Sequence, residues 1–244
     1  MKVLAIESSA TAASAALMEP SRLLGQFFIH TRLTHSQTLI PMVEALLHTA
    51  EVSWDEIDAL AVAAGPGSFT GVRIGVSSVK GMAFTRNLPC VGVSALEAMA
   101  WPLGGMEGVT ICCVMDARRQ QVYNALFRIE KGTPVRITPD RALAISELTA
   151  ELSSGENPSG LVLVGDGAAL CYGEMKETIP SIRLSPLPLR IQSAAGVAML
   201  AIRKIEKGET VSGDALMPRY LRLPQAEREL RKKQETEKGK GKEK

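Results

Sequence analysis

Residues 65–75 combine the residue types that can hold an anion or let a partner approach closely. Their sequence, GPGSFTGVRIG, follows an apolar, strand-like segment at 59–64 and leads into a segment of helical composition at 70–84. Glycine and proline bend a backbone tightly and leave room beside it. Ser68 or Thr70 can cap the helix, whose free N–H groups can then hold an anion. A ligand or partner site is one hypothesis; a purely structural turn fits the local features equally well.

Two phosphate-binding motifs are excluded for this run. It is not a Walker loop, because no Gly-Lys-Ser/Thr sequence closes it. It is not a dinucleotide fingerprint either, because the glycine spacing differs and the run lies far from the first strand.

The histidines do not form an obvious metal-binding motif. His30 and His35 are five residues apart across an expected strand–helix junction, and His48 lies further along the same helix. We expect His35 to orient this helix or to contact the backbone, and His48 to lie on the surface near the negative end of the helix dipole. No metal site is predicted.

The composition is that of an ordinary globular protein. Of 244 residues, 45% are hydrophobic and 22% are charged, which allows one large domain or two lobes. Cys90, Cys112, Cys113 and Cys171 form no CxxC pair and are expected to be buried free thiols. The N-terminus has no signal-peptide pattern, and no run approaches 18 apolar residues. We therefore expect a cytoplasmic protein without a membrane partner.

The net charge of +2 comes from the end of the chain. Residues 225–244 contain eight Lys or Arg and five Glu, a net +3, so the remainder carries −1. A body this close to neutral does not suggest a nucleic-acid-binding surface. We expect residues 225–244 to be a disordered or weakly helical, solvated tail.

Hydrophobic periodicity predicts an α/β lobe at 1–103. Three short strands form an antiparallel meander, and helices and strands then alternate. The expected elements are strands at 2–7, 12–18 and 23–30, a helix at 36–50, a strand at 59–64, a helix at 70–84, a strand at 88–93 and a helix at 94–101.

A second, smaller lobe is predicted at 104–224, beginning after the Pro-Leu-Gly-Gly sequence at 102–105. Its pattern partly repeats that of the first lobe. The expected elements are strands at 109–115, 121–129 and 134–138, a helix at 146–153, a strand at 161–165, a helix from 168, an irregular stretch at 180–188 and an amphipathic helix at 193–207. The last helix is able to pack back on the first lobe.

Several sequence blocks together resemble the TsaB (YeaZ) family over residues 2–223. The 65–75 run, with Lys80-Gly81, is the most specific. The other blocks are LAIESS at 4–9, HSQTLIP at 35–41, SALEA at 94–98, DARR at 116–119 with Val122-Tyr123, GDGA at 165–168 and PRYLR at 218–222. Each block is weak alone, but their order and spacing match the family.

The resemblance implies a fold and a function. The fold is the two-lobed α/β fold of actin, Hsp70 and sugar kinases (ribonuclease H-like), with mixed sheets and a reduced second lobe. The function is support of the threonylcarbamoyltransferase TsaD in making threonylcarbamoyladenosine in tRNA. TsaB proteins pair with TsaD, the ATPase TsaE acts on the pair, tRNA is reached through the complex, and a homodimer is expected without TsaD.

The resemblance also implies a nucleotide cleft and a partner surface. In this superfamily the turn after the first strand and the glycine-rich turn of the second lobe flank a nucleotide. No cofactor is required by this chain, but ATP or ADP is compatible with the complex. The implied cleft residues are Glu7, Ser8, Ser9, Gly165, Asp166 and Gly167. The implied interface residues are Leu39, Ile40, Val43, Leu47, Gly71, Ile74, Gly75, Ser78 and Met82.

The chain lacks the metal-binding histidines of TsaD. TsaD carries a His-x-x-x-His motif after the strand that corresponds to 88–93, and Ala95 and Met99 stand at those positions here. We therefore expect no catalytic residue and no metal. The alternatives are a metal-dependent, glycoprotease-like peptidase and a stand-alone small-molecule kinase that uses Asp116 or Asp166.

The charged residues of the DARR block have two interpretations. Asp116, Arg118 and Arg119 follow an apolar, strand-like segment. We favour a hairpin turn with a local ion pair; contact with a partner or with tRNA is the alternative.

Overall fold

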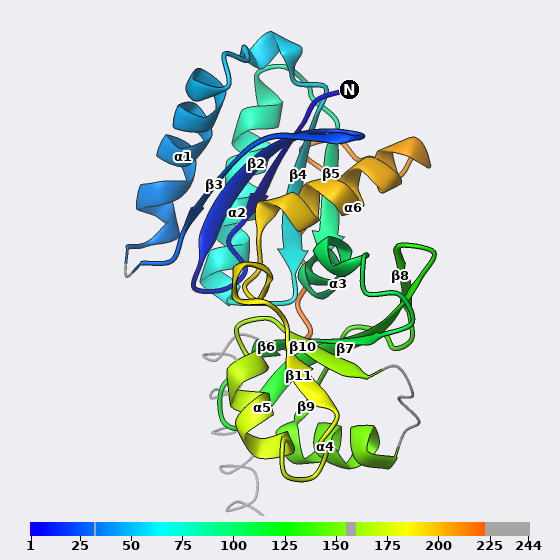
Figure 1. The fold of residues 1–244 in the computed structure, drawn as a ribbon. Helices are drawn as coiled ribbons and strands as arrows, with labels where there is room; N and C mark the ends of the chain where they lie inside the picture. Colours follow the sequence, from blue (N-terminus) through cyan, green and yellow to red (C-terminus); the bar gives the residue numbers. More distant parts are fainter. Residues whose placement is uncertain (32, 155–159, 223–244) are drawn as a thin grey trace, which may run out of the picture.

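The computed structural model describes residues 1–31, 33–154 and 160–222 as two α/β lobes, one above the other in Figure 1. Each lobe contains one mixed sheet. The mixed α/β class is therefore confirmed. The predicted tail at 225–244 lies outside the described residues.

The first sheet has five strands in the order β3-β2-β1-β4-β5. The β1–β2 and β2–β3 pairs are antiparallel, while β1–β4 and β4–β5 are parallel. The central strands β1 and β4 are buried throughout, which is why both read as uninterrupted apolar runs. The strands are β1 (Val3–Glu7), β2 (Ala13–Glu19), β3 (Arg22–Ile29), β4 (Ala59–Gly65) and β5 (Cys90–Ser94).

Helices cover both faces of the first sheet (Figure 1). On one face, α1 and α2 pack over a core that contains Leu4, Leu60 and Val62. On the other face lie α3 and α6, whose core also contains residues of the second sheet. The helices are α1 (His35–Thr49), α2 (Phe69–Phe84), α3 (Ala95–Ala100) and α6 (Ala194–Glu206).

Side-chain caps fix where the helices of the first lobe begin. Ser68 accepts a hydrogen bond from the Gly71 N–H at 3.3 Å, so Ser68 rather than Thr70 caps α2. Ser94 caps α3 in the same way. Thr34 forms a capping box with Gln37, so α1 begins at His35, one residue before the predicted start.

Among the described residues, the second sheet contains six strands. Its path is β11-β10-β6-β7-β8, and β9 also pairs with β7. Strands β9 and β11 are not among the predicted strands, since both have only three or four residues and β11 lies in the proline-containing stretch. The strands are β6 (Thr110–Asp116), β7 (Gln121–Glu130), β8 (Thr133–Arg136), β9 (Arg141–Ala144), β10 (Leu161–Val164) and β11 (Ile182–Leu184). Helices α4 (Ile145–Ser154) and α5 (Ala168–Met175) pack together beside this sheet.

The two lobes share one hydrophobic core. Helix α6 contacts β1 and β2 of the first sheet, and the Ala194 N–H donates a hydrogen bond to Ser14 Oγ at 2.8 Å. Helix α3 lies between the sheets and contacts Phe127 and Ile129 of β7 through the same buried cluster. Three 3₁₀ turns complete the described elements: Trp54–Glu56, Trp101–Leu103 and Leu187–Leu189. The lobe boundaries at 103 and 104 stay a prediction.

Two glycines of α2 allow the helix to approach the end of β1 closely. A Cβ on Gly71 would overlap the Ser8 carbonyl oxygen, and one on Gly75 would lie 2.5 Å from Ser8 Oγ and 3.2 Å from Val62. The Ser8 hydroxyl in turn donates a hydrogen bond to the Gly71 carbonyl at 2.9 Å. These glycines therefore serve packing within the chain, and their predicted place in a partner interface stays a prediction.

We predict opposite effects on stability for alanine at two glycines of α2. Gly71→Ala places a methyl group against backbone and should lower the free energy of unfolding by about 1–3 kcal/mol. Gly81→Ala meets nothing within 4 Å and should raise it by up to about 1 kcal/mol, because alanine favours a helix. Urea denaturation measures both changes, and equal changes would contradict this account of α2 packing.

Candidate functional site: the interlobe cleft

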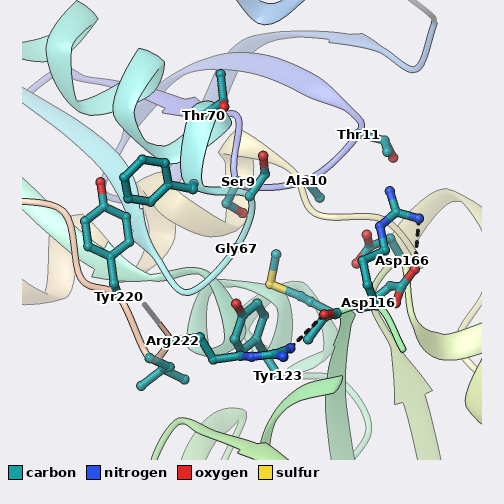
Figure 2. Close-up of a pocket in the computed structure, with 16 residues that line it drawn as sticks. Ser9, Ala10, Thr11, Gly67, Thr70, Asp116, Tyr123, Asp166, Tyr220 and Arg222 are labelled. Atoms are coloured by element: carbon teal, nitrogen blue, oxygen red, sulfur yellow. Dashed lines mark hydrogen bonds and ion pairs between the residues drawn. The ribbon is translucent and has the colours of Figure 1, made fainter. Parts of the chain in front are cut away.

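A cleft of about 550 Å³ separates the two lobes (Figure 2). The first lobe contributes the turn after β1 at residues 9–11 and the glycine-rich turn at 67–70. The second lobe contributes residues 115–118, Tyr123 and Asp166. Residues 220–222 form a third wall.

Two of the six predicted nucleotide residues line this cleft. Ser9 and Asp166 do so, whereas Glu7, Ser8, Gly165 and Gly167 are not among the lining residues. The Ser9 side chain is buried and its Oγ has no hydrogen-bond partner.

Glu7, at the end of β1, is a buried carboxyl group with one free oxygen. Its Oε1 accepts a hydrogen bond from the Ser9 N–H at 2.5 Å, while Oε2 has no partner. Burial raises the pKa of Glu7 to about 7, and the negative charge of Asp166 adds to this, although the hydrogen bond from the Ser9 N–H opposes it. Glu7 thus changes charge close to neutral pH.

The aspartates of the second lobe differ in environment. Gln192 Nε2 donates a hydrogen bond to Asp166 at 2.8 Å, and burial raises the pKa of Asp166 above its usual value. Asp116 accepts a hydrogen bond from the Arg118 N–H at 2.7 Å and forms an ion pair with the Arg118 guanidinium at 3.3 Å. This local pair at the β6–β7 turn confirms the hairpin interpretation. Arg118 also lines the cleft, and residues 118–120 all have positive φ.

The charged residues that line the cleft have partners within the chain. Asp116 and Asp166 carry negative charge into the cleft, and the cations among the lining residues are Arg118 and Arg222. Arg118 is paired with Asp116, and the Arg222 guanidinium donates to the Ala117 carbonyl at 2.8 Å. Both cations among the described lining residues are therefore already engaged within the chain.

The positions of the TsaD histidines lie in the hydrophobic core. Ala95 and Met99 are both buried on α3. His35 donates a hydrogen bond from Nε2 to the Ala10 carbonyl at 2.7 Å, so its predicted contact with the backbone is confirmed. In the described part of the chain, no group of three His, Cys, Asp or Glu residues could hold a metal ion.

The predicted interface residues divide between core and surface. Leu39, Val43 and Leu47 of α1 are buried against the first sheet, so their prediction as contact residues is wrong: the apolar stripe of α1 packs on its own lobe. Ile40 is exposed, and Ile74, Ser78 and Met82 are half-buried. The exposed side of the two helices also includes Pro41, Ala45, Ser77, Gly81 and Phe84. We call these nine residues the outer face.

All four cysteines are free and buried, as predicted. Burial raises the pKa of each thiol, so none is activated as a nucleophile. Within residues 1–31, 33–154 and 160–222, none of the helices combines the length and hydrophobicity that crossing a bilayer requires.

The aromatic and basic residues near the end of the described chain belong to the cleft, although no role was predicted for them. Tyr220 and Arg222 line the cleft, and the Tyr220 ring stacks on Phe69 with centroids 4.8 Å apart. Both residues belong to the PRYLR block, so the signal was present. A sequence pattern does not reveal that residues 220–222 return to a turn more than 100 positions earlier.

The fold and the cleft define a two-lobed α/β protein with a mixed sheet in each lobe. A family model described as "TsaD: tRNA N6-adenosine threonylcarbamoyltransferase" matches residues 30–229. The tRNA threonylcarbamoyladenosine biosynthesis protein TsaB of Bacillus subtilis is 30% identical over 93% of this chain and 96% of its own. The Escherichia coli TsaB protein is 32% identical over 91% of this chain and 95% of its own. The structure of YeaZ from Pseudomonas aeruginosa superposes with a TM-score of 0.74 at 28% identity, covering 90% of this chain and 99% of its own. The chain belongs to the TsaB (YeaZ) family.

Glu7 should make stability depend on pH. Its folded-state pKa of about 7 exceeds the ordinary value of 4.5, which applies to the unfolded chain. Between pH 4.5 and pH 7 the folded protein therefore binds more protons than the unfolded chain, and the free energy of unfolding falls as the pH rises through this range. Relative to Glu7→Gln, the wild type should lose about 2–3 kcal/mol of unfolding free energy between pH 5 and pH 8. Urea denaturation at both pH values measures this difference. The exposed Glu44→Gln serves as control, and wild-type and Glu7→Gln values that change in parallel would refute the assignment.

Proposed function

We propose that this chain is a non-catalytic subunit of the tRNA threonylcarbamoyladenosine modification complex, and that it works in the cytoplasm by binding and supporting TsaD. Its relatives in Bacillus subtilis and Escherichia coli are named for threonylcarbamoyladenosine biosynthesis, and the family model that it matches describes the transferase itself. A chain that shares the fold of a catalyst is well suited to pair with it pseudo-symmetrically.

The observation that carries the proposal is the outer face of α1 and α2. These helices contact each other and present Ile40, Phe84 and Gly81 on one side of the first lobe. Phe84 is 82% exposed at the end of α2. Apolar and small residues together allow helices of another protein to approach closely. The outer face thus supports docking of TsaD through a four-helix contact.

The residues of the chain support a role without catalysis. Ala has no metal-binding donor and Met is a soft ligand, so Ala95 and Met99 cannot replace a histidine pair. A peptidase mechanism has no set of three metal ligands among the described residues. A kinase mechanism needs a free catalytic aspartate, but Asp116 is paired with Arg118 and Asp166 with Gln192.

The family resemblance extends the proposal to the other partners. TsaE acts on the assembled pair, and tRNA is bound through the complex rather than by this chain. Without TsaD, the outer face is free to pair with a second copy in a homodimer. No cofactor is required by this chain, and ATP or ADP in the complex would depend on residues that TsaD supplies.

A single arginine on the outer face should block the TsaD contact. Gly81→Arg projects from an exposed helical position with nothing within 4 Å, so the isolated chain should stay folded. It should weaken binding of TsaD from the same organism at least tenfold, about 1.4 kcal/mol, as measured by isothermal titration calorimetry. Gly173→Arg on α5, also helical, exposed and without neighbours within 4 Å, is the matched control.

The two ways in which this experiment can fail are distinct. If TsaD binds neither the wild type nor Gly173→Arg, the subunit hypothesis is wrong. If TsaD binds all three proteins equally, the subunit role stands but the outer face is not the interface.

A further inference from the structure

Residues 209–222 form an extended segment, here called the C-terminal strap, that follows α6 and returns along the first lobe. It begins by closing the open edge of β5, where Cys90 and Val211 exchange backbone hydrogen bonds at 2.8 and 2.9 Å. Leu216 then inserts its side chain into the core beneath α1 and α2. The first part of the strap is therefore firmly anchored.

Helix α2 holds the strap along one flank. Lys80 Nζ donates hydrogen bonds to the carbonyl oxygens of Asp214 at 3.1 Å and Leu216 at 3.3 Å. Two turns earlier, Arg73 Nε donates to the Tyr220 hydroxyl at 3.0 Å. Lys80 is half-buried, whereas Arg73 is exposed. A protein that docks on the outer face can therefore reach the end of the strap through Arg73.

The end of the strap crosses the glycine-rich turn. The Arg219 N–H donates to the Ala64 carbonyl at 2.6 Å, and a Cβ on Gly65 would overlap the Arg219 carbonyl oxygen. Gly65 also has a φ of +122°, which other residues rarely adopt. Both this backbone conformation and the overlap with Arg219 therefore exclude a side chain at position 65. The Tyr220 ring stacks on Phe69, and the Arg73 guanidinium lies 3.9 Å from the Phe69 centroid.

Beyond Tyr220 the strap spans the cleft to the second lobe. Arg222 reaches the Ala117 carbonyl, at the start of the β6–β7 turn. Figure 2 shows Tyr220 and Arg222 on one wall of the cleft, across from Asp166. The strap thus links the flank of α2 to the second lobe.

We propose that the C-terminal strap is a clasp that couples docking on the outer face to the opening of the cleft. A docked partner that draws Arg73 away from Tyr220 removes one of the contacts that hold residues 219–222. With only the Arg219–Ala64 hydrogen bond and the Tyr220–Phe69 contact left on this side, Arg222 is released from Ala117 more easily. The clasp then opens and exposes the cleft. This inference rests on the proposed function, because TsaD is the docked partner.

Thermodynamic linkage predicts whether loss of the hydrogen bond between Arg73 and Tyr220 strengthens or weakens TsaD binding. If docking must break the hydrogen bond between Arg73 and Tyr220, removing that bond beforehand makes docking more favourable. Tyr220→Phe deletes the hydroxyl and keeps the stacked ring, so it should tighten TsaD binding about two- to tenfold, the worth of one hydrogen bond. Tyr172→Phe on α5 is the matched control and should leave affinity unchanged.

Hydrogen exchange measured by mass spectrometry reports the clasp directly. Binding of TsaD to the full wild-type chain should speed amide exchange in 217–222 about tenfold at Arg219, whose N–H is bonded to the Ala64 carbonyl, while exchange at 211–216 stays the same. In the isolated chain, Arg222→Ala should speed exchange at 217–222 in the same way, and Arg203→Ala, on α6, should not.

Each outcome decides a different point. Unchanged or slower exchange at 217–222 in the TsaD complex, or weaker binding by Tyr220→Phe, overturns the clasp while leaving the subunit role intact. Absence of any TsaD binding overturns the proposed function and the coupling with it. Unchanged exchange in isolated Arg222→Ala shows that Arg222 does not hold the strap and refutes the clasp by itself.

Discussion

The close contact between α2 and the end of β1 determines most of what this protein can do. Because Gly71 and Gly75 have no side chains, α2 settles directly on Ser8, and the Ser8 hydroxyl and the Gly71 carbonyl form a hydrogen bond. The Ser68 N–H donates to the Ser9 carbonyl at 2.7 Å, which ties the glycine-rich turn to the turn after β1. One contact thereby fixes a wall of the cleft and orients the outer face of α2.

The shared core constrains how the lobes can respond. Helix α3 is buried between the two sheets, and α6 packs on the first sheet although it follows the second lobe in sequence. Large movements of one lobe would expose this core, whereas the cleft side is joined by the end of the strap through Arg222. The lobes are thus joined by a shared hydrophobic core on one side, and at the cleft by the hydrogen bond from Arg222 to the Ala117 carbonyl.

Much of the fold could be predicted from the sequence, because periodicity and capping are local signals. The strands predicted at 59–64 and 121–129 and the helix predicted at 70–84 lie within one residue of their observed bounds. The burial of Leu39 and Val43 was misjudged as a partner surface, because one apolar stripe looks the same whether it packs on its own sheet or on another protein. Glu7 and Asp166 were expected in one cleft; only Asp166 lines it, since burial depth depends on packing between lobes. The path of the strap could not be predicted, because its contacts join residues far apart in sequence.

The most direct test of the central claim is a modification assay that leaves TsaD intact. Threonylcarbamoyladenosine formation would be measured in tRNA supplied with threonylcarbamoyl-adenylate, TsaD and TsaE, with the wild-type chain or with a variant carrying Glu7→Gln and Asp166→Asn. The account predicts equal product from both chains, because these carboxyl groups take no part in the reaction. Loss of product from a variant that still binds TsaD normally would show that this chain contributes catalytic residues and would contradict the account.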